Sequence, residues 1–226
     1  MFYEPDKNDH GLKYDPYKSI VVPRPIGWIS TVNAAGRVNL APFSQFNNLG
    51  YDPPYVMFAA SNFPLAARPK DSVANVIETG AFVVNMATYE LREAVNITSS
   101  AVDPDIDEAA LAGLEMIPSK LVAPPRVAAS PVHLECQYYS MLALPGRNLE
   151  QSHYVVVGRV VGVHIRDDVF TADGKIDILK LRPLARLGYH DYTSVESVFT
   201  MTPTGPRAEL RKSGLEGKPR PARAAE

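Results

Sequence analysis

The segment Lys70–Ser72 places a lysine, an aspartate and a hydroxyl group side by side where a helix is expected to begin. An apolar face and a closing glycine predict that this helix covers residues 70–79. The free amides at a helix N-terminus favour an anion, and a lysine ammonium adds a full positive charge. The same pattern is typical of a helix whose first amides are capped by Asp71 or Ser72. Taken alone, the residues favour the capped start, with an anion site as the alternative.

Motifs of the common catalytic and metal-binding classes are missing. There is no GxGxxG or GxxxxGK[ST] phosphate loop, no HExxH zinc motif and no GxSxG nucleophile elbow. No two of the five histidines are three or four residues apart, so no metal site is expected. Cys136 is the only cysteine, which excludes an intrachain disulfide. Its place on the apolar face of an expected strand predicts a buried small side chain.

The composition is that of a globular protein able to bury a full core: of 226 residues, 46% are hydrophobic and 21% are charged. The formal net charge of −2 gives no basic surplus for binding nucleic acid or an anionic membrane surface. The N-terminus lacks the apolar core of a secretory signal, and no run of about 18 apolar residues suggests a membrane span. These features favour a cytoplasmic protein that binds neither nucleic acid nor membrane.

The hydrophobic pattern favours a mainly β fold, a β-barrel with helical insertions. Strands are expected at 19–22, 27–33, 37–43, 55–60, 81–86, 132–144 and 154–165, with a last strand or loop at 185–195. Besides the helix at 70–79, a second is expected from Thr88, as its cap, to about Asn96. A short third helix ends near Gly113, with capping-box spacing between Asp105 and Glu108. Gly158 and Gly162 lie in the long valine-rich strand, where they would allow a close approach or curvature.

Three regions follow from the pattern along the chain. They are an irregular N-terminal arm over residues 1–18, one domain over 19–199 and a flexible tail over 200–226. The tail is expected because its composition shifts toward Pro, Gly, Arg, Ala and Glu.

Four segments, taken together, carry a family resemblance. They are PRPIGWISTVNAAGRVNLAPFSQFN (23–47), DPPYVMFAAS (52–61), KDSVANVIETGAFVVNM (70–86) and APPRVAASPVHLEC (123–136). In this order and spacing, from about residue 14 to about residue 195, the chain resembles the flavin reductase-like family of FMN-binding split barrels. The resemblance implies a split β-barrel that carries the flavin ring on the hairpin at 27–43.

The resemblance implies contacts between the flavin ring and both strands of this hairpin. Hydroxyls and backbone amides would meet the edge of the ring, and a Pro-Phe pair would bring the chain close to it. The implied contacts are Trp28, Ser30, Thr31, Ala41, Pro42, Phe43 and Ser44. The alternative is that Trp28 and Phe43 are core aromatics. A buried Ser44 hydroxyl needs a partner, which favours the site.

By the same resemblance, the FMN phosphate would lie at the helix start considered first. The implied contacts are Lys70 and Ser72, with Ser61 and Asn62 after the third strand. Asp71 is assigned to capping, because a carboxylate beside the phosphate would repel it.

His190 is a further candidate in the last segment. It would orient a nicotinamide or a substrate, or donate a proton near neutral pH. A lone histidine is more often structural or exposed, and that alternative stays open.

The resemblance implies an NAD(P)H-dependent flavin reductase that works as a homodimer and needs no obligatory catalytic acid or base. NADH or NADPH would give a hydride to N5 of FMN, and the electrons would pass to free flavin, to oxygen or to a partner enzyme such as a monooxygenase. One alternative is a flavoredoxin-like electron-transfer protein without reductase activity. Another is a split barrel that binds a different ligand, such as haem, or serves as a scaffold.

Overall fold

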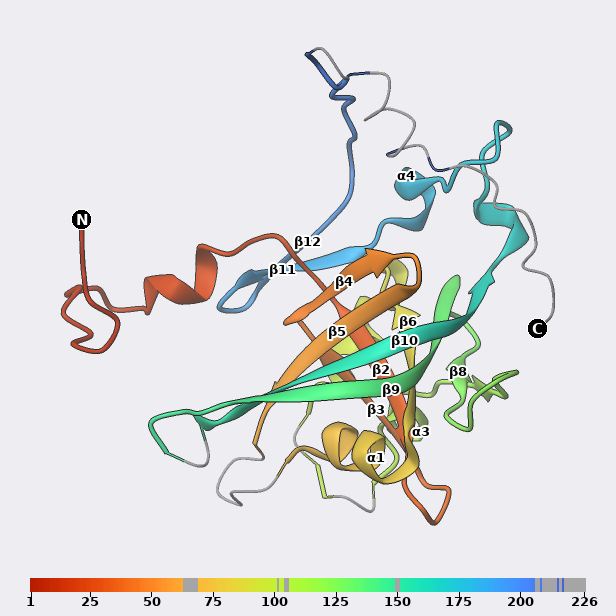
Figure 1. The fold of residues 1–226 in the computed structure, drawn as a ribbon, viewed down its shortest axis with the longest axis horizontal. Helices are drawn as coiled ribbons and strands as arrows, with labels where there is room; N and C mark the ends of the chain where they lie inside the picture. Colours follow the sequence, from red (N-terminus) through yellow and green to blue (C-terminus); the bar gives the residue numbers. More distant parts are fainter. Residues whose placement is uncertain are drawn as a thin grey trace. The chain divides into compact units, whose positions relative to one another are not determined.

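The computed structural model describes residues 1–62, 69–100, 102–103, 106–148 and 151–205, together with positions 208, 215 and 217 (Figure 1). The chain divides into two compact units, Met1–Glu196 and Ser197–Glu226. All of the elements below belong to the first unit. The tail predicted at 200–226 lies in the second unit, and most of it falls outside the described residues.

A seven-stranded antiparallel sheet forms the body of the first unit and curls into a split barrel (Figure 1). Its strand order is β3-β2-β6-β9-β10-β5-β4, so β3 and β4 are the two edge strands. The two longest strands, β9 and β10, form one extended hairpin. The strands are β2 (Gly27–Val32), β3 (Val38–Phe43), β4 (Phe46–Tyr51), β5 (Pro54–Ser61), β6 (Ala81–Met86), β9 (Val132–Leu144) and β10 (His153–Ile165).

Two small sheets and several short helices complete the unit. Strand β1 (Arg24–Pro25) pairs with β11 (Leu184–Gly188), which forms a hairpin with β12 (Asp191–Ser194). Strands β7 (Met116–Ile117) and β8 (Arg126–Val127) pair with each other. The α-helices are α1 (Asp71–Thr79), α2 (Arg92–Ile97), α3 (Glu108–Leu111) and α4 (Ile178–Leu181), and the 3-10 helices are η1 (Pro16–Ser19), η2 (Tyr89–Leu91) and η4 (Asp167–Val169).

Strand β2 is buried along its whole length because it is covered on both faces. Ile29 packs in the barrel interior against Phe58, in a cluster to which α1 contributes Val73 and Val76. Trp28 belongs to a second cluster, which residues of α2 and α3 help to form. The serine and threonine of β2 therefore lie in the core and not on a surface.

Most of the predicted elements are confirmed. The strands expected at 27–33, 37–43, 55–60, 81–86, 132–144 and 154–165 correspond to β2, β3, β5, β6, β9 and β10, and the helix expected at 70–79 corresponds to α1. The mainly β split barrel is confirmed with them. The close approach at Gly158 is also confirmed, because a Cβ at that position would lie 2.3 Å from Cζ of Phe82.

Two expectations about strands need correction. No strand forms at 19–22, where the Ser19 hydroxyl donates to the carbonyl of Leu187 and pairing begins only at Arg24. The segment at 185–195 is the hairpin β11–β12, whose turn at Tyr189 and His190 follows Gly188, and both Gly188 and Tyr189 have positive φ. Strand β4 was not predicted from the sequence.

Two predicted helix starts are also different. Thr88 precedes the 3-10 helix η2, makes no capping hydrogen bond and forms a bridge with Pro183. The side chain of Asp107 caps α3, and the Glu108 carboxyl accepts a hydrogen bond from the N–H of Leu40. Asp105 lies outside the described residues.

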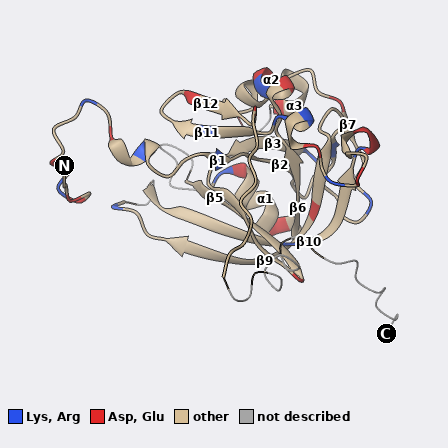
Figure 2. Cartoon of the chain, turned by 90° about the horizontal axis from the view of Figure 1, so that it is seen from above, with Lys and Arg blue, Asp and Glu red and all other residues tan. Residues whose placement is uncertain are grey.

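Charged side chains gather on the helices and turns of the first unit, while β9 and β10 are largely neutral (Figure 2). In the part of the chain that the structure describes, no helix has the length and apolar character needed to cross a membrane. Within the same residues, no group of three or more His, Cys, Asp or Glu side chains is placed to hold a metal ion.

Candidate functional site

A cavity of about 110 Å³ lies where the edge strand β3 meets the N-terminus of α1. We call it the β3–α1 pocket. Four separate segments line it: β3, the start of α1, the turn after α2 and the first residue of α3. The lining residues are Asn39, Ala41, Pro42, Phe43, Lys70, Asp71, Ser72, Thr98, Ser99, Ser100, Val102 and Glu108.

Lys70 brings a partly desolvated positive charge to this pocket. It directly precedes the first turn of α1, and its side chain makes no capping hydrogen bond. The ammonium Nζ lies 5.9 Å from the centre of the Phe43 ring. Burial lowers the pKa of the Lys70 ammonium. A cation in this position, next to the first amides of a helix, is suited to bind an anion.

Ser72 links the start of α1 to β3. The N-cap residue of α1 is Lys70, and not Asp71 or Ser72 as predicted, and the Ser72 hydroxyl accepts a hydrogen bond from Asn39 Nδ2 at 2.8 Å. The residue is only 2% exposed. Its hydroxyl hydrogen is still a donor that a ligand in the pocket can use.

Three hydroxyl residues directly after α2 complete much of the wall. Thr98 faces the core, where its Oγ1 accepts from Trp28 Nε1 at 2.9 Å. Ser99 donates from its Oγ to the carbonyl of Asn96 at 2.6 Å, and Ser100 follows it. None of these three residues was predicted from the sequence. The available signal was the run of hydroxyls at 98–100 immediately after an expected helix.

Glu108 is a nearly buried carboxyl group in the same wall, with 8% of its surface exposed. Its Oε2 accepts the backbone N–H of Leu40 at 3.2 Å, which holds the side chain against the outer edge of β3. Burial raises the pKa of Glu108, the two hydrogen bonds from backbone N–H groups partly oppose this, and the charges of Asp107 and Asp71 raise it further. From the sequence, Glu108 was predicted only as part of a helix cap.

Five of the residues expected to bind the cofactor meet in the β3–α1 pocket. They are Ala41, Pro42, Phe43, Lys70 and Ser72. The strand β3 and the helix start were predicted as separate contacts for the ring and the phosphate, and the structure brings them to one cavity.

The side chains of Trp28, Ser30 and Thr31 are placed differently. None has exposed surface, because β2 is covered on both faces. The Ser30 hydroxyl donates to the carbonyl of Pro125 at 2.5 Å, and Thr31 Oγ1 accepts from Asn75 Nδ2 at 3.0 Å. These side chains are therefore engaged inside the protein and do not line the pocket.

Ser44, Ser61 and Asn62 also lie away from the pocket lining. The Ser44 hydroxyl, just after β3, accepts from Arg24 Nε at 3.5 Å. Ser61 pairs with His153 at the end of β5, and the buried Asn62 forms a bridge with Pro69.

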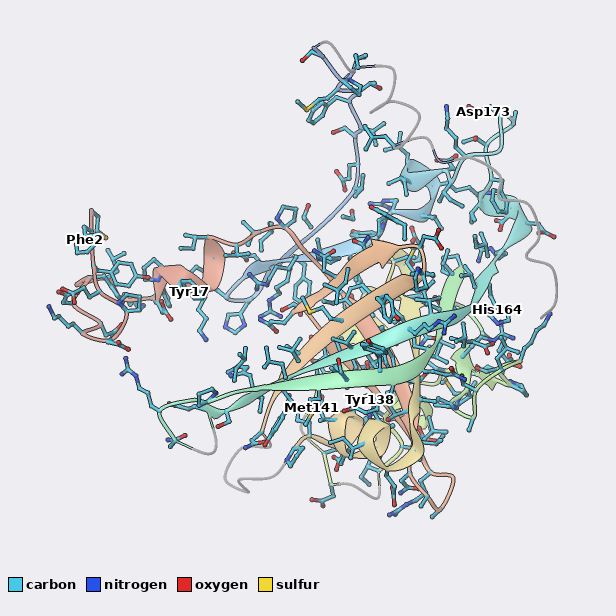
Figure 3. All side chains as sticks on the ribbon, in the orientation of Figure 1. Phe2, Tyr17, Tyr138, Met141, His164 and Asp173 are labelled. Carbon is cyan, nitrogen blue, oxygen red and sulfur yellow. The ribbon has the colours of Figure 1, made fainter. Side chains whose placement is uncertain are left out.

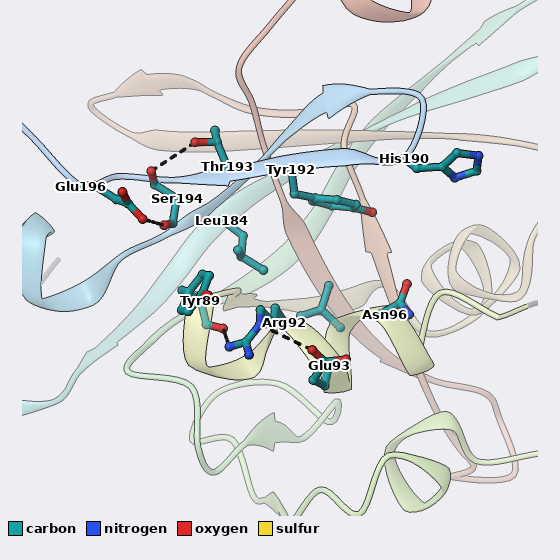
Figure 4. Close-up of a pocket in the computed structure, with 11 residues that line it drawn as sticks. Tyr89, Arg92, Glu93, Asn96, Leu184, His190, Tyr192, Thr193, Ser194 and Glu196 are labelled. Carbon is teal, nitrogen blue, oxygen red and sulfur yellow. Dashed lines mark hydrogen bonds and ion pairs between the residues drawn. The ribbon is translucent and has the colours of Figure 1, made fainter.

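A larger cavity of about 490 Å³ lies between α2 and the β11–β12 hairpin, and we call it the hairpin pocket (Figure 4). Tyr192 extends across it above α2, and His190 stands at its rim in the hairpin turn. Asn96 of α2 lines this cavity, and residues 98–100 line the β3–α1 pocket. The two cavities thus adjoin the same short segment of chain.

The β sheet and the two pockets described above can now be compared with those of known protein families. The family model described as "Flavin reductase like domain" matches residues 19–193. The chain belongs to this flavin reductase-like family, and the resemblance noted in the sequence is confirmed.

Individual proteins and solved structures are similar to this chain over most of its length. An uncharacterised protein from Halalkalibacterium halodurans is 35% identical over 89% of this chain and 95% of its own length. The crystal structure of nitrilotriacetate monooxygenase component B from Bacillus cereus is similar, with a TM-score of 0.81, 27% identity and coverage of 89% of this chain and 98% of that chain. The 2-nitrobenzoate 2-nitroreductase of Pseudomonas fluorescens has a TM-score of 0.76 and 27% identity, covering 89% of this chain and 95% of that chain.

The β3–α1 pocket offers the donors that a flavin phosphate needs. It combines a desolvated ammonium, the N-terminal amides of a nine-residue helix and hydroxyl groups from two segments. At about 110 Å³ the cavity is smaller than a whole cofactor, and suits the phosphate and the adjoining part of the ribityl chain. The donor set therefore fits a phosphorylated flavin.

Proposed function

We propose that this chain is an NAD(P)H-dependent flavin reductase that holds FMN with its phosphate in the β3–α1 pocket. The observation that carries the proposal is the placement of Lys70. Its ammonium is partly removed from water at the start of α1, with hydroxyl groups around it. An anion at this position would relieve the cost of burying that charge.

Each part of the pocket has a distinct role in holding the cofactor. Lys70 neutralises the phosphate, and Ser72 and Ser100 supply hydroxyl donors to it, while the Ser99 hydroxyl is already donated to the carbonyl of Asn96. Strand β3 is an edge strand, so the backbone of Ala41–Phe43 faces the ring without a further strand in the way. The N–H of Leu40 is already bound by Glu108, which leaves the later residues of β3 for the flavin.

FMN bound in this way would accept a hydride from NADH or NADPH and release electrons one or two at a time. The chain itself orients the two reactants. We assign the nicotinamide or the electron acceptor to the hairpin pocket, where Tyr192 offers a flat apolar surface and His190 a polar group at the rim. A monooxygenase is a candidate acceptor, because the similar Bacillus cereus protein is a monooxygenase component B.

We also propose that two copies of the chain assemble. The β3–α1 pocket is too small to enclose a whole flavin, and a second copy would provide the missing wall for the ring. The exposed end of β9 is the surface we assign to this contact.

The proposal is tested by loading the purified protein with FMN and mixing it with NADH or NADPH without oxygen. We expect a visible flavin spectrum and rapid loss of the oxidised flavin band with one of the two nucleotides. A protein that binds FMN but is not reduced on a catalytic time scale would instead be an electron-transfer protein. A colourless protein that takes up no FMN would overturn the proposal entirely.

A further inference from the structure

Glu108 is an unusual component for a pocket that binds a phosphate. Its carboxyl lines the same cavity as Lys70 and the hydroxyl groups of Ser72 and Ser99. If ionised, it would place a negative charge beside a dianion in a site with little water, which disfavours binding. A neutral carboxylic acid would carry no such penalty, and its O–H would be a hydrogen-bond donor.

The position of Glu108 is fixed by the fold. It is the first residue of α3, and the Asp107 side chain caps this helix through the amides of Ala109 and Ala110. One carboxyl oxygen, Oε2, accepts the N–H of Leu40 on the edge of β3. The two residues are 68 positions apart in the sequence, so the tertiary fold, and not local structure, places the carboxyl in the pocket wall.

The charges around Glu108 come from two elements. Asp107 precedes it in sequence, and Asp71 faces it from α1, both of them carboxylates. Lys70, also at the start of α1, is the cation of the same pocket. Strand β3 contributes the backbone amide of Leu40, and its residues Val38–Phe43 include no titratable side chain. Burial and the two carboxylates raise the pKa of Glu108, whereas the backbone amides lower it, and the net effect is a pKa above the usual value of a glutamate.

We propose that Glu108 is a further residue of the cofactor site, that it meets the phosphorylated flavin as a neutral carboxylic acid, and that its ionisation weakens FMN binding. The proposal rests on the FMN site proposed above and adds its regulation. Binding of the phosphate dianion and binding of a proton by Glu108 then favour each other, so FMN binding takes up a proton and FMN release gives one up. If Glu108 served only as a hydrogen-bond partner of Leu40, FMN affinity would not be coupled to the protonation of Glu108.

The test measures the dissociation constant of FMN by quenching of flavin fluorescence, between about pH 5.5 and pH 8.5, for the wild type and Glu108→Gln. The glutamine side chain still offers an oxygen to the N–H of Leu40 and cannot ionise. The second ionisation of the phosphate affects both proteins alike, so the ratio of their dissociation constants isolates Glu108. We expect this ratio (wild type over variant) to be nearly constant at low pH and to rise with pH, by at most about tenfold per pH unit.

Riboflavin, which lacks the phosphate, is the control ligand. Its ratio of dissociation constants should change with pH much less than that of FMN, because the repulsion requires the phosphate. An FMN ratio that is independent of pH would overturn the inference and leave the FMN site standing. Failure of both proteins to bind FMN at every pH would overturn the FMN site itself, and the inference with it.

A second variant keeps the inference testable if Glu108→Gln does not fold. Replacing the neighbouring carboxylate, as Asp71→Asn, removes a charge that raises the pKa of Glu108. The pH at which FMN affinity begins to fall should therefore move to a lower value. An unchanged or higher midpoint would contradict the role of Glu108.

Discussion

Lys70 gives the most direct test of the phosphate site at the scale of single residues. Lys70→Met keeps the apolar stem of the side chain and removes the charge. A hydrogen bond to a charged group contributes roughly 1.5–3 kcal/mol, so we expect FMN affinity to fall by roughly 10- to 100-fold. The measurement is a fluorescence titration with FMN.

The matched control is Lys175→Met. Lys175 carries the same side chain, and it is 80% exposed and paired with Asp173 outside the pocket. Its replacement should leave FMN affinity within about twofold of the wild type, as is usual for exposed positions. Equal losses of FMN affinity in Lys70→Met and Lys175→Met would show that removing any lysine charge has this effect, and that the pocket is not specifically involved.

The residues of the pocket differ in how far the sequence could predict them. The helix start at Lys70–Ser72 was predictable because it is a local pattern, but the assignment of Lys70 and Ser72 to a phosphate came from the family resemblance and stays a prediction. Glu108 was not, since its partner is the amide of Leu40 in a distant strand and its local spacing suggests a helix cap. Ser30 and Thr31 were assigned to the ring edge, but the strand that carries them is buried on both faces, which depends on what packs against it.

At the scale of elements, a buried carboxyl joins the chain before β8 to the hairpin β9–β10. Glu135 of β9 has no exposed surface and accepts the N–H groups of Lys120 and Leu121 at 2.8 and 2.6 Å. The ring of His164 on β10 contacts it at 2.5 Å (Figure 3). Burial would raise the pKa of Glu135, but these hydrogen bonds together hold it below its usual value.

We therefore expect Glu135→Gln to lower the free energy of unfolding at pH 7 by roughly 1–3 kcal/mol, the cost of disturbing buried hydrogen bonds to a charged group. Because the folded-state pKa of Glu135 is lowered, its contribution is complete above the unfolded pKa of about 4.3 and is lost as the pH falls through the folded-state value. Urea unfolding of both proteins at neutral and acid pH measures this.

The exposed Glu115→Gln serves as the control and should change stability by less than about 0.5 kcal/mol. The difference in the free energy of unfolding between the wild type and Glu135→Gln should become smaller at acid pH. A difference that stays the same through the acid range would show that the charge of Glu135 does not carry the effect.

The strands were predictable to different degrees, for physical reasons. The bounds of β6 and β9 agree with the prediction because their apolar residues follow a clear pattern. Strand β4 was missed because FNNLGY has few β-formers, and as an edge strand it pairs only with β5 and is mostly exposed. The β11–β12 hairpin was ambiguous since its turn uses Tyr189 at a φ of 46°, where no Asn-Gly or similar signal marks it.

At the scale of the whole molecule, the end of β9 is an exposed strand edge with apolar side chains. Strand β6 pairs with β9 only as far as Gln137, and no described strand pairs with that side of β9 beyond it. Tyr139, Leu142 and Leu144 on this end are 65%, 58% and 44% exposed. An unpaired edge with apolar side chains favours association with another chain. A second copy of this chain is the partner we propose, since the flavin pocket also needs a further wall.

The assembly is tested by Leu142→Arg, with Leu179→Arg as the control. Leu179 is 44% exposed on α4, away from this edge of β9. We expect the wild type and the control to sediment as dimers. Leu142→Arg should shift toward monomer, because burying an unpaired charge in a contact is strongly unfavourable. FMN affinity should fall along with dimerisation, because the monomer offers only the small β3–α1 pocket. A wild type that sediments as a monomer with full FMN affinity would contradict the shared site and would require one copy to enclose the flavin alone.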